Sequence, residues 1–416
     1  MALRAEAIRT VLLPRLRLRR PDSRPPHPER SRPRSASRGL RAALSAVAFA
    51  ALLGAVATAG PIARAAPLGG AAAATGVRAQ VPPGVSAGVA VFDRTTGTFT
   101  EQINASAQYR SASVVKLLIA LDLLWNRTPD SLPVADRNRL EAMLRSSDDS
   151  AASHYWSVNG SGAVVDRMVS RLGLTDTARP PAAYPGYWGY TAVSARDTVK
   201  IYRHVLETAP VPVRDYVMGN LRQPTRCAGD GFDQHFGVAG SFLRPWAVKQ
   251  GWSGFGARGD CNVSARTTEG PPPTAAAVDL ARPALHSTGV VGAGDRSVVA
   301  ILTLHPSGTS YGKAYTDIGK LTRSLNVPGA VRPTGTWFET WGSGVQVRSG
   351  ATTVAAPQAR LPEGVEVLVA CQKQGQEVTV PPYVNDWWAH LPLYGGWMTN
   401  IYLKTPGNTA PGVPRC

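Results

Sequence analysis

The segment 113–125 places the strongest constraint on the fold, because its large apolar residues face every side of a helix. Eight of them occur between Val114 and Leu124, and these are Val114, Val115, Leu117, Leu118, Ile119, Leu121, Leu123 and Leu124. A helix that is apolar all round is stable only when other elements cover it. The chain has 44% apolar and 18% charged residues, so it can build such a core and is not disordered throughout.

Patterns on both sides of this segment predict an α+β domain. Strands are expected at 85–93 and 99–109, around the turn Thr95-Thr96-Gly97, and again at 246–251, 286–291 and 297–303. Helices are expected at 113–125, 137–145, 163–172, 195–206 and 313–325. Strands at both ends with helices between them favour one antiparallel sheet that the two ends share.

Residues 1–65 have the composition of an export segment. Residues 1–41 contain twelve Arg and only three acidic residues, an uncharged apolar stretch follows from Ala42 to Ala59, and Ala63-Arg64-Ala65 has the small-residue pattern of a cleavage site. This order predicts export by the general secretory route to the cell envelope or the medium. The apolar stretch is either removed or retained as a membrane anchor. The Gly/Ala/Pro-rich residues 66–84 are expected to form a flexible spacer.

The net charge of +17 and the sequence pI of about 10.2 suggest at first a nucleic-acid-binding protein. The residues up to Ala65 account for +10 of this charge, so residues 66–416 carry only +7. No cluster of Lys and Arg with interleaved aromatic residues follows the export segment. We therefore expect no nucleic-acid partner.

Four cysteines, Cys227, Cys261, Cys371 and Cys416, all lie beyond the export segment. An even number of cysteines in an exported chain predicts disulfides. Three pairings are possible, and the domain layout favours Cys227–Cys261 and Cys371–Cys416. The seven His are scattered without metal-ligand spacing, so neither a metal nor another cofactor is expected.

Ser113 and Lys116 stand one helical turn apart at the start of the apolar segment. Ser113 is a natural helix N-cap, which is a purely structural interpretation. Lys116 shares its helix face, and burial lowers the pKa of a lysine, which lets the amine accept the proton of a serine hydroxyl. A second match to Ser-x-x-Lys, at Ser310 and Lys313, lies in a Gly-rich polar stretch and is interpreted as coincidental.

Two further motifs follow the first match. Ser147-Asp148-Asp149 stands 34 residues after Ser113, and Lys249-Gln250-Gly251-Trp252 stands 102 residues after Ser147, on an apolar strand. With these three motifs in this order, residues 85–328 resemble the superfamily of serine β-lactamases and D-Ala-D-Ala peptidases, in the form found in exported actinobacterial proteins. The resemblance implies a β-lactamase-like domain, an antiparallel sheet with helices.

The resemblance also implies roles for the matching residues. Ser113 would be the acylated nucleophile and Lys116 its proton acceptor. Ser147 would relay a proton to the leaving amine, and Lys249 would steer a substrate carboxylate. The backbone N–H groups of Ser113 and Trp252 would form the oxyanion hole, while Asp148 would hold its loop.

Three departures from the pattern put efficient β-lactam hydrolysis in doubt. Asp149 replaces an Asn, and an ionised Asp accepts hydrogen bonds but donates none. Gln250 replaces the hydroxyl residue that helps to bind the substrate carboxylate. No Glu occurs between Leu172 and Thr191, the region in which class A β-lactamases carry the Glu that activates the deacylating water. We expect slow deacylation, another substrate or a decayed site.

The segment 227–237 holds Asp230, Asp233 and His235 among four glycine and cysteine positions. These side chains fit either a catalytic role or a purely structural one, in a Gly-rich turn between disulfide-linked segments. The turn is the interpretation that we adopt.

The C-terminal residues are expected to fold separately, after a linker at 329–335. Residues 336–410 resemble a bacterial SH3-type domain, a small all-β barrel, through Gly344-Val345-Gln346-Val347-Arg348, Trp387-Trp388-Ala389 and the stretch from Gly396 to Leu403. Residues 411–416 form a short tail. Such modules are similar to cell-wall-targeting domains, although their Trp residues also serve to close a small core.

Taken together, these patterns predict an exported, monomeric serine hydrolase that acts through an acyl-Ser113 intermediate. Its substrate would be a β-lactam or an amide like that of a peptidoglycan peptide. The alternative is a wall-associated binding protein that kept this fold and lost the activity.

Overall fold

The computed structural model describes residues 79–256, 259, 261 and 278–416. The predicted export segment 1–65 and most of the spacer 66–84 therefore lie outside the described residues. Within the described part of the chain, no helix is both long and apolar enough to cross a membrane. All of the described residues belong to one unit of mutually contacting elements.

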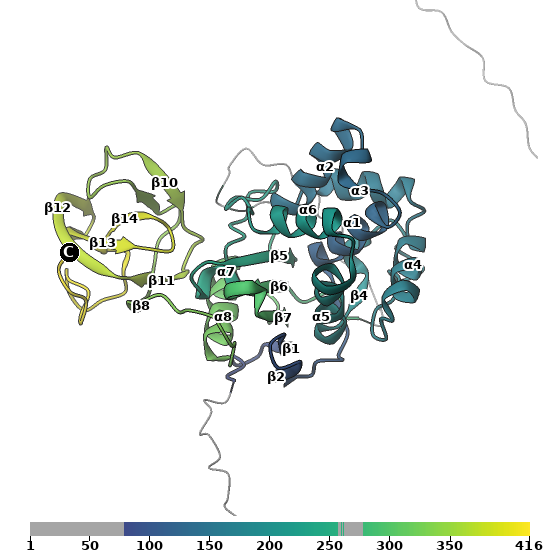
Figure 1. Ribbon diagram of the computed structural model, residues 1–416. Coiled ribbons are helices and arrows are strands. Elements are labelled where there is room, and N and C mark those ends of the chain that lie inside the picture. The colour runs from purple at the N-terminus through teal and green to yellow at the C-terminus, as the bar shows by residue number, and fades with distance from the viewer. Residues whose placement is uncertain (1–78, 257–258, 260, 262–277) are drawn as a thin grey trace, which may run out of the picture. The chain divides into compact units, whose positions relative to one another are not determined.

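Five antiparallel strands form the main sheet, in the order β2-β1-β7-β6-β5 (Figure 1). The strands are β1 (Ser86–Asp93), β2 (Thr98–Ile103), β5 (Trp246–Ser253), β6 (Ala284–Val291) and β7 (Ser297–Leu304). Strand β1 pairs with β7 along its whole length, from Ser86 opposite Leu304 to Asp93 opposite Ser297. The prediction that strands from both ends of the domain share one sheet is confirmed.

The second predicted strand, 99–109, is wrong in its length. Strand β2 ends at Ile103, and Tyr109–Arg110 forms a separate short strand, β3, that pairs with β4 (Ala192–Val193). Asn104, with a φ of 41°, adopts the left-handed conformation directly after β2. This turn redirects the chain, so the alternation of the sequence does not continue in one strand.

The sheet is buried on both faces, because its residues alternate between two apolar clusters. Ala90, Ala247 and Ala300 pack with the helices that follow Ser113, while Val91, Val248 and Val299 pack on the opposite face. Helices cover the first face: α1 (Lys116–Leu124), α2 (Val134–Arg145), α3 (Asp149–Val158), α4 (Ala163–Leu172), α5 (Ala195–Arg203) and α6 (Val211–Leu221). The second face carries α7 (Val238–Ser241) and α8 (Tyr311–Ser324).

Three of these helices, α3, α6 and the four-residue α7, were not predicted. Helix α3 starts with charged and small polar residues that look like a loop, and its apolar contacts come only from Ala151, Ala152, Tyr155 and Trp156. Helix α6 follows Pro210 and contains Pro212, and proline at the start of a helix breaks the apolar pattern without breaking the helix. Helix α1 confirms that the apolar segment is buried, since seven of its nine residues are buried.

The C-terminal residues form two further antiparallel sheets. A five-stranded sheet has the order β10-β9-β14-β13-β12, and a two-stranded sheet joins β11 to β8. The strands are β8 (Thr336–Glu339), β9 (Gln346–Arg348), β10 (Pro357–Arg360), β11 (Glu366–Val369), β12 (Cys371–Val380), β13 (Tyr383–Leu391) and β14 (Gly396–Thr399). The all-β character is confirmed, but the pairing of the described strands gives no closed barrel, so the likeness to an SH3 domain stays a prediction.

The segment before β11 packs directly on α8. Val365 and Ile318 belong to one buried apolar cluster, and the backbone N–H of Glu366 donates to the Thr316 hydroxyl at 2.9 Å. Gly312 allows this approach, because a Cβ atom there would lie 2.0 Å from the carbonyl oxygen of Glu363. The C-terminal strands thus share part of their core with the second face of the main sheet.

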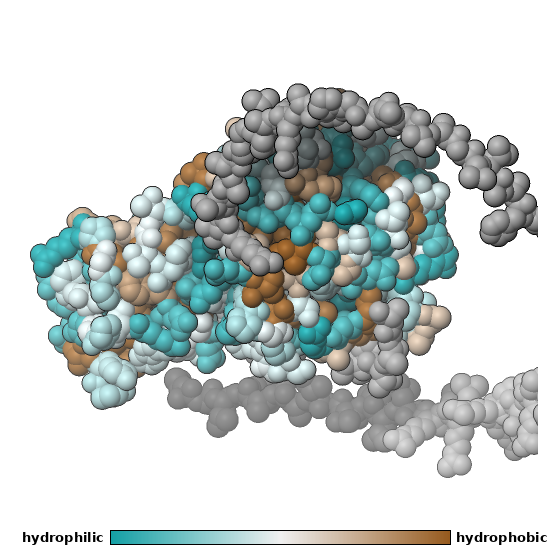
Figure 2. Space-filling view, turned by 90° about the horizontal axis from the view of Figure 1, so that it is seen from below, coloured by the Kyte–Doolittle hydropathy of each residue, from teal (hydrophilic) through white to brown (hydrophobic). Residues whose placement is uncertain are grey.

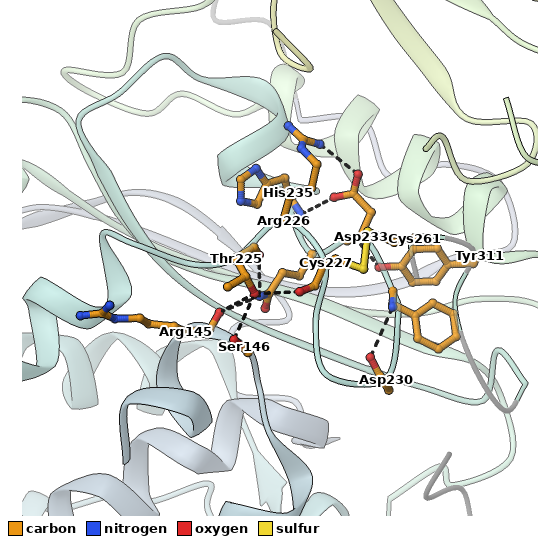
Figure 3. The surroundings of a disulfide bond; sticks show 12 residues. Arg145, Ser146, Thr225, Arg226, Cys227, Asp230, Asp233, His235, Cys261 and Tyr311 are labelled. Carbon is orange, nitrogen blue, oxygen red and sulfur yellow. Dashed lines mark hydrogen bonds and ion pairs between the residues drawn. A yellow bond between two sulfur atoms is a disulfide. The ribbon is translucent and has the colours of Figure 1, made fainter. Parts of the chain in front are cut away.

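Both predicted disulfides are present. Cys227 pairs with Cys261 across 34 residues, and Cys371 pairs with Cys416 across 45 residues. Figure 3 shows the first of them beside the turn that carries Asp230 and Asp233. The second joins the C-terminal residue to the start of β12.

Hydrophilic side chains predominate on the face that Figure 2 shows, with smaller apolar patches between them. The large apolar side chains with the greatest exposure are Val354 at 87%, Val158 at 63% and Val134 at 62%. They stand on separate elements, and scattered exposure of this kind is normal for a soluble surface.

Candidate active site

Ser113 lies in a tight 3₁₀ turn, Ala112–Val115, directly before α1. No side-chain hydrogen bond caps either this turn or α1, so capping, the structural alternative, does not explain Ser113. Ala112 has a φ of 44°, a left-handed conformation that costs a non-glycine residue on the order of 1–3 kcal/mol. The turn is held in a conformation that its sequence does not favour, which is common where a reactive group must be presented.

The second Ser-x-x-Lys match gives a direct comparison. The hydroxyl of Ser310 accepts the backbone N–H of Lys313 at 3.3 Å and caps α8. Lys313 is an exposed partner of Asp317. The polar stretch therefore does precede a helix, and the match is an ordinary N-cap.

Strand β5 passes close to the Ser113 turn from the other side. A Cβ atom at Gly251 would lie 2.9 Å from the carbonyl oxygen of Ser111 and 3.2 Å from the nitrogen of Ser113. Because β5 is the last strand of the sheet, it presents backbone groups on its free side. Glycine at 251 is what allows this edge to meet the turn.

Ser147 occupies the bend between α2 and α3, with a φ of 55°. Asp148 follows as the N-cap of α3, where its carboxylate accepts the backbone N–H of Ala151 at 2.7 Å. This is the structural role that the sequence predicted for Asp148. The cap fixes the start of α3 and so the positions of Ser147 and Asp149.

Two buried lysines meet at Ser147. Lys249 Nζ donates to the Ser147 hydroxyl at 2.8 Å, and Lys116 Nζ lies 3.3 Å from the same oxygen. Lys116 also donates to the Ser147 carbonyl at 2.5 Å and pairs with Asp149 Oδ1 at 2.6 Å. The two lysine residues are 0% and 1% exposed. The network places two amines and one hydroxyl together without access to bulk water.

The environment of Lys249 favours its neutral amine. Burial lowers the pKa of Lys249 well below its usual value near 10.5, and the positive charge of Lys116 lowers it further. Asp149 and Asp230 oppose this shift without outweighing it. A buried amine of this kind can accept a proton from a hydroxyl that it contacts.

A cavity of about 570 Å³ opens in front of Ser113. Its lining comes from the Ser113 turn, α3, the segment 186–190, the disulfide-linked turn and the end of β5: Arg110, Ala112, Ser113, Asp149, Ser153, Gly186, Tyr187, Trp188, Gly189, Tyr190, Asp230, Phe232, Trp252, Ser253, Gly254, Gly256, Leu280 and Ala281. Lys116, Ser147 and Lys249 lie behind this lining.

Of the residues predicted for the site, Ser113, Asp149 and Trp252 line the cavity. Gln250 does not, because its amide donates to the carbonyl oxygens of Gln234 and Phe236, at 3.1 and 2.7 Å. The hydroxyl of Ser113 makes no hydrogen bond with a described residue, so neither lysine contacts it directly. The predicted residues gather around one cavity, with Gln250 on the other face of β5.

Asp230 is the main residue of the site that sequence reasoning missed, since it had been assigned to a structural turn. Its carboxylate accepts the indole N–H of Trp252 at 2.8 Å and lines the cavity. Burial raises the pKa of Asp230, and the nearby charge of Asp149 raises it further, against the hydrogen bond from Trp252. The Asp230 turn is held by the Cys227–Cys261 disulfide (Figure 3).

The other members of the same stretch are structural, as expected. Asp233 pairs with Arg226 at 2.9 Å, and burial lowers the pKa of His235 to about 4. Neither residue lines the cavity.

An aromatic wall, missed as well, closes the cavity on the side of the segment 184–190. The rings of Tyr187 and Tyr190 stack at 5.1 Å, and Tyr184 meets both edge-on. The Trp188 ring covers Lys116 at 4.7 Å and donates its N–H to Ser153 at 3.1 Å. The sequence did contain a signal for this wall, because four aromatic residues occur within seven positions. Among the described residues, no group of His, Cys, Asp and Glu could hold a metal ion.

No protein-family model matches the sequence. A curated protein of Mycobacterium tuberculosis with the name "Putative lipoprotein LppW" is 38% identical over 175 residues, which are 41% of this chain and 54% of that protein. The protein of the same name from Mycobacterium bovis matches over the same share. The chain thus spans about half the length of the curated relatives that it matches.

The solved structures to which the chain is similar include PBP-A and a class A β-lactamase. PBP-A has a TM-score of 0.43 and 15% identity, over 59% of this chain and 90% of its own. The class A β-lactamase from Mycobacterium abscessus has a TM-score of 0.41 and 17% identity, over 58% of this chain and 92% of its own.

Proposed function

We propose that this chain is an exported serine hydrolase that acylates Ser113 with a substrate bound in the cavity. The observation that carries the proposal is the network of contacts around Ser147, next to the cavity that Ser113 lines. One hydroxyl, that of Ser147, meets two buried amines, and the cavity in front is large enough for a small acyl donor. The proposed substrates are esters or amides, with β-lactams and peptidoglycan-like peptides as the classes that the three motifs imply.

In the proposed reaction, the Ser113 oxygen attacks the substrate carbonyl carbon, and its proton passes to the Ser147–Lys249 pair. The backbone N–H groups of Ser113 and Trp252 stabilise the oxyanion, which is worth about 3–4 kcal/mol for one such donor in an enzyme site. The leaving group takes the proton back through Ser147. Water then hydrolyses the acyl-Ser113 ester and regenerates the free hydroxyl.

We assign the proton acceptor to Lys249, acting through Ser147, and give Lys116 a positioning role. An ammonium that pairs with a carboxylate has no lone pair, and Lys116 forms an ion pair with Asp149 at 2.6 Å. Lys249 contacts the Ser147 hydroxyl at a shorter distance than Lys116 does. Lys116 instead holds the Ser147 carbonyl and so fixes the left-handed bend.

The proposed location is the cell envelope. The composition of residues 1–65 is that of an export segment, two disulfides suit an oxidising compartment, and the matching mycobacterial relatives carry a lipoprotein name. The C-terminal sheets are proposed as the SH3-like module that holds the protein at the wall.

A neutral fluorophosphonate probe tests the nucleophile directly, because it reacts with activated serines whatever charge the natural substrate has. The full chain is incubated with the probe, and separately with penicillin G, and the adduct is located by peptide mass spectrometry. We expect the phosphonyl group on Ser113, with loss of fluoride, and no adduct in Ser113→Ala. Absence of any adduct on Ser113 with both reagents would sink the proposal.

The Lys116–Asp149 ion pair also supports a second candidate function, a wall-associated binding protein that kept the site and lost its turnover. In that case the cavity binds its ligand without forming a bond. The fluorophosphonate experiment separates the two, since binding alone leaves the mass of the protein unchanged.

A further inference from the structure

We infer that the acyl donor carries a cationic group, and that this group binds in the cavity between Asp230 and the aromatic wall. The inference rests on the proposed function, because it names the class of substrate that reaches Ser113. An ammonium-bearing ester or amide fits the site better than an anionic one.

The charges that face the cavity are the first reason. Among the described residues, two carboxylates, Asp149 and Asp230, line it, whereas the buried Lys116 and Lys249 are not part of the lining. Lys249 was expected to steer a substrate carboxylate, but it is 1% exposed and donates to Ser147 and to the Gln250 carbonyl. A carboxylate that enters the cavity therefore meets Asp230 before it reaches either lysine.

Arg110 is the one basic side chain in the lining of described residues, and its guanidinium is already used within the protein. It donates to the Ser253 hydroxyl at 2.7 Å, the Asp279 carbonyl at 2.8 Å and the Arg282 carbonyl at 2.5 Å. Arg110 as a whole is only 2% exposed. These bonds hold the segment 279–282 against β5 and leave Arg110 little freedom to bind an anion.

The two carboxylates differ in what they contact. Asp149 pairs with Lys116 at 2.6 Å, so its charge is already balanced. Asp230 forms no ion pair with a described residue, and its oxygens accept only N–H groups, from Trp252 at 2.8 Å and from Phe232 at 3.4 Å. Burial raises the pKa of its carboxyl group. A ligand cation next to Asp230 would stabilise its ionised carboxylate against the cost of burial.

The aromatic side chains of the lining favour the same class of ligand. Tyr187, Trp188 and Tyr190 form one side, and Phe232 and Trp252 stand beside Asp230. The faces of such rings attract ammonium groups, and several rings around a carboxylate are a common arrangement for binding them. The Trp188 ring already receives the Lys116 ammonium at 4.7 Å, on its protein side.

Three esters with the same three-carbon spacer test the charge preference on the full chain, and the cationic and neutral ones also have the same shape. They are the p-nitrophenyl esters of 4-(trimethylammonio)butanoate, of the neutral isostere 5,5-dimethylhexanoate and of the anion glutarate. In each reaction the Ser113 oxygen bonds to the acyl carbon, the bond to p-nitrophenolate breaks, and the serine proton goes to the Ser147–Lys249 pair. Release of p-nitrophenolate gives kcat/KM, and Ser113→Ala provides the background.

We expect the cationic ester to react at least about tenfold faster than the neutral isostere, and the anionic ester more slowly than both. Asp230→Asn should abolish the rate advantage of the cationic ester over its neutral isostere. Asp130→Asn is the matched control, because it removes the same charge at a side chain that is 93% exposed. It should leave the preference intact.

The outcomes separate the inference from the proposed function. No acylation of Ser113 by the neutral ester contradicts the proposed function itself. Equal rates for the three esters, or a preference that survives Asp230→Asn, overturn the inference and leave the hydrolase intact. If Asp230→Asn does not fold, inhibition of the unaltered chain tests the inference instead. Choline must then compete with the neutral ester more strongly than its isostere 3,3-dimethylbutan-1-ol, and equal inhibition overturns the inference.

Discussion

Ser147 is the residue at which the two buried amines of the candidate site meet, and the proposed chemistry depends on it. Its left-handed φ of 55° turns its carbonyl toward Lys116 and its hydroxyl toward Lys249. A non-glycine residue in this conformation is kept there by its surroundings, and here the surroundings are the Lys116 contact and the Asp148 cap. The bend, the two lysines and the start of α3 therefore form one unit.

Asp149→Asn tests whether the ion pair restrains the site. Replacing the carboxylate by an amide frees the Lys116 amine from its partner and adds a donor toward the cavity. We expect acylation of Ser113 by the neutral ester to become about tenfold faster, a gain of about 1.4 kcal/mol in the barrier. The measurement is the rate of p-nitrophenolate release, with Asp130→Asn as the control. A slower variant would mean that Asp149 itself takes part in proton transfer.

Lys249→Met tests Lys249 as the proton acceptor. The substitution should also change how the stability of the protein depends on pH. The native state holds Lys249 at a lowered pKa, so between that pKa and the value of about 10.4 in the unfolded chain the unfolded state binds more protons. The unaltered protein therefore gains stability as pH rises through this window, and the buried charge costs most at lower pH.

Methionine keeps the side-chain length without the charge. We expect Lys249→Met to lose acylation by about 100-fold or more and to have a higher Tm than the unaltered protein near neutral pH, with the difference shrinking as pH rises. Thermal unfolding over a pH series is the measurement. A difference in Tm that is constant with pH would show that Lys249 does not titrate in the native state as its environment predicts.

At the residue scale, the sequence predicted the groups that gather at the candidate site but could not supply their contacts. Ser113, Lys116, Ser147 and Lys249 follow from motifs that are short and contiguous. Asp230 and Gln250 were misjudged because their roles depend on which face of a turn or strand meets the cavity. That face is set by the Cys227–Cys261 turn and by the pairing of β5 with β6.

At the scale of elements, the edge strand β5 and the Ser113 turn define the shape of the site together. The strand brings Lys249 to one face and Gln250 to the other, as alternation requires. Its approach to the turn depends on Gly251. The backbone N–H groups proposed for the oxyanion hole come from these same two elements.

Gly251→Ala should reduce the rate of acylation much more than it reduces the stability of the fold. The added Cβ would lie 2.9 Å from the Ser111 carbonyl oxygen, which forces the turn and the strand apart. We expect acylation to fall about 100-fold, as for the loss of an oxyanion-hole donor, with a smaller loss of stability that thermal unfolding measures.

Gly219→Ala is the matched control for this substitution. Gly219 lies in α6, and a Cβ atom there meets nothing within 4 Å. Alanine in an open helical position should stabilise the protein by roughly 0.5–1 kcal/mol and leave acylation unchanged. Equal acylation by the two alanine variants would remove Gly251 from the proposed site.

At the scale of the whole molecule, the described residues are organised by a sheet in which β1 pairs with β7 and by a core that continues into the C-terminal strands. The two disulfides act on different parts of it. Cys227–Cys261 holds the turn with Asp230, while Cys371–Cys416 closes the C-terminal strands. Closure of a loop of 34 or 45 residues stabilises a fold by roughly 3–4 kcal/mol through the unfolded chain.

The paired variants Cys227→Ser with Cys261→Ser and Cys371→Ser with Cys416→Ser should therefore lose similar amounts of unfolding free energy, measured in denaturant. Only the first pair should also lose the preference for the cationic ester, since only it releases Asp230. A loss of preference in both pairs, or in neither, would contradict the placement of Asp230 by its disulfide.

The sequence by itself determined those elements that depend only on residues close together in the chain. The buried helix α1, the strands of the main sheet apart from the end of β2, and the three motifs follow from periodicity, spacing and residue chemistry. For the cysteines, the domain layout favoured the two pairings that the structure shows. The tertiary structure decided the rest, namely that Lys116 pairs with Asp149, that Gln250 points away and that Asp230 and the aromatic wall face Ser113. These facts depend on contacts between segments up to about a hundred residues apart, and no local pattern records which charge will be buried next to which.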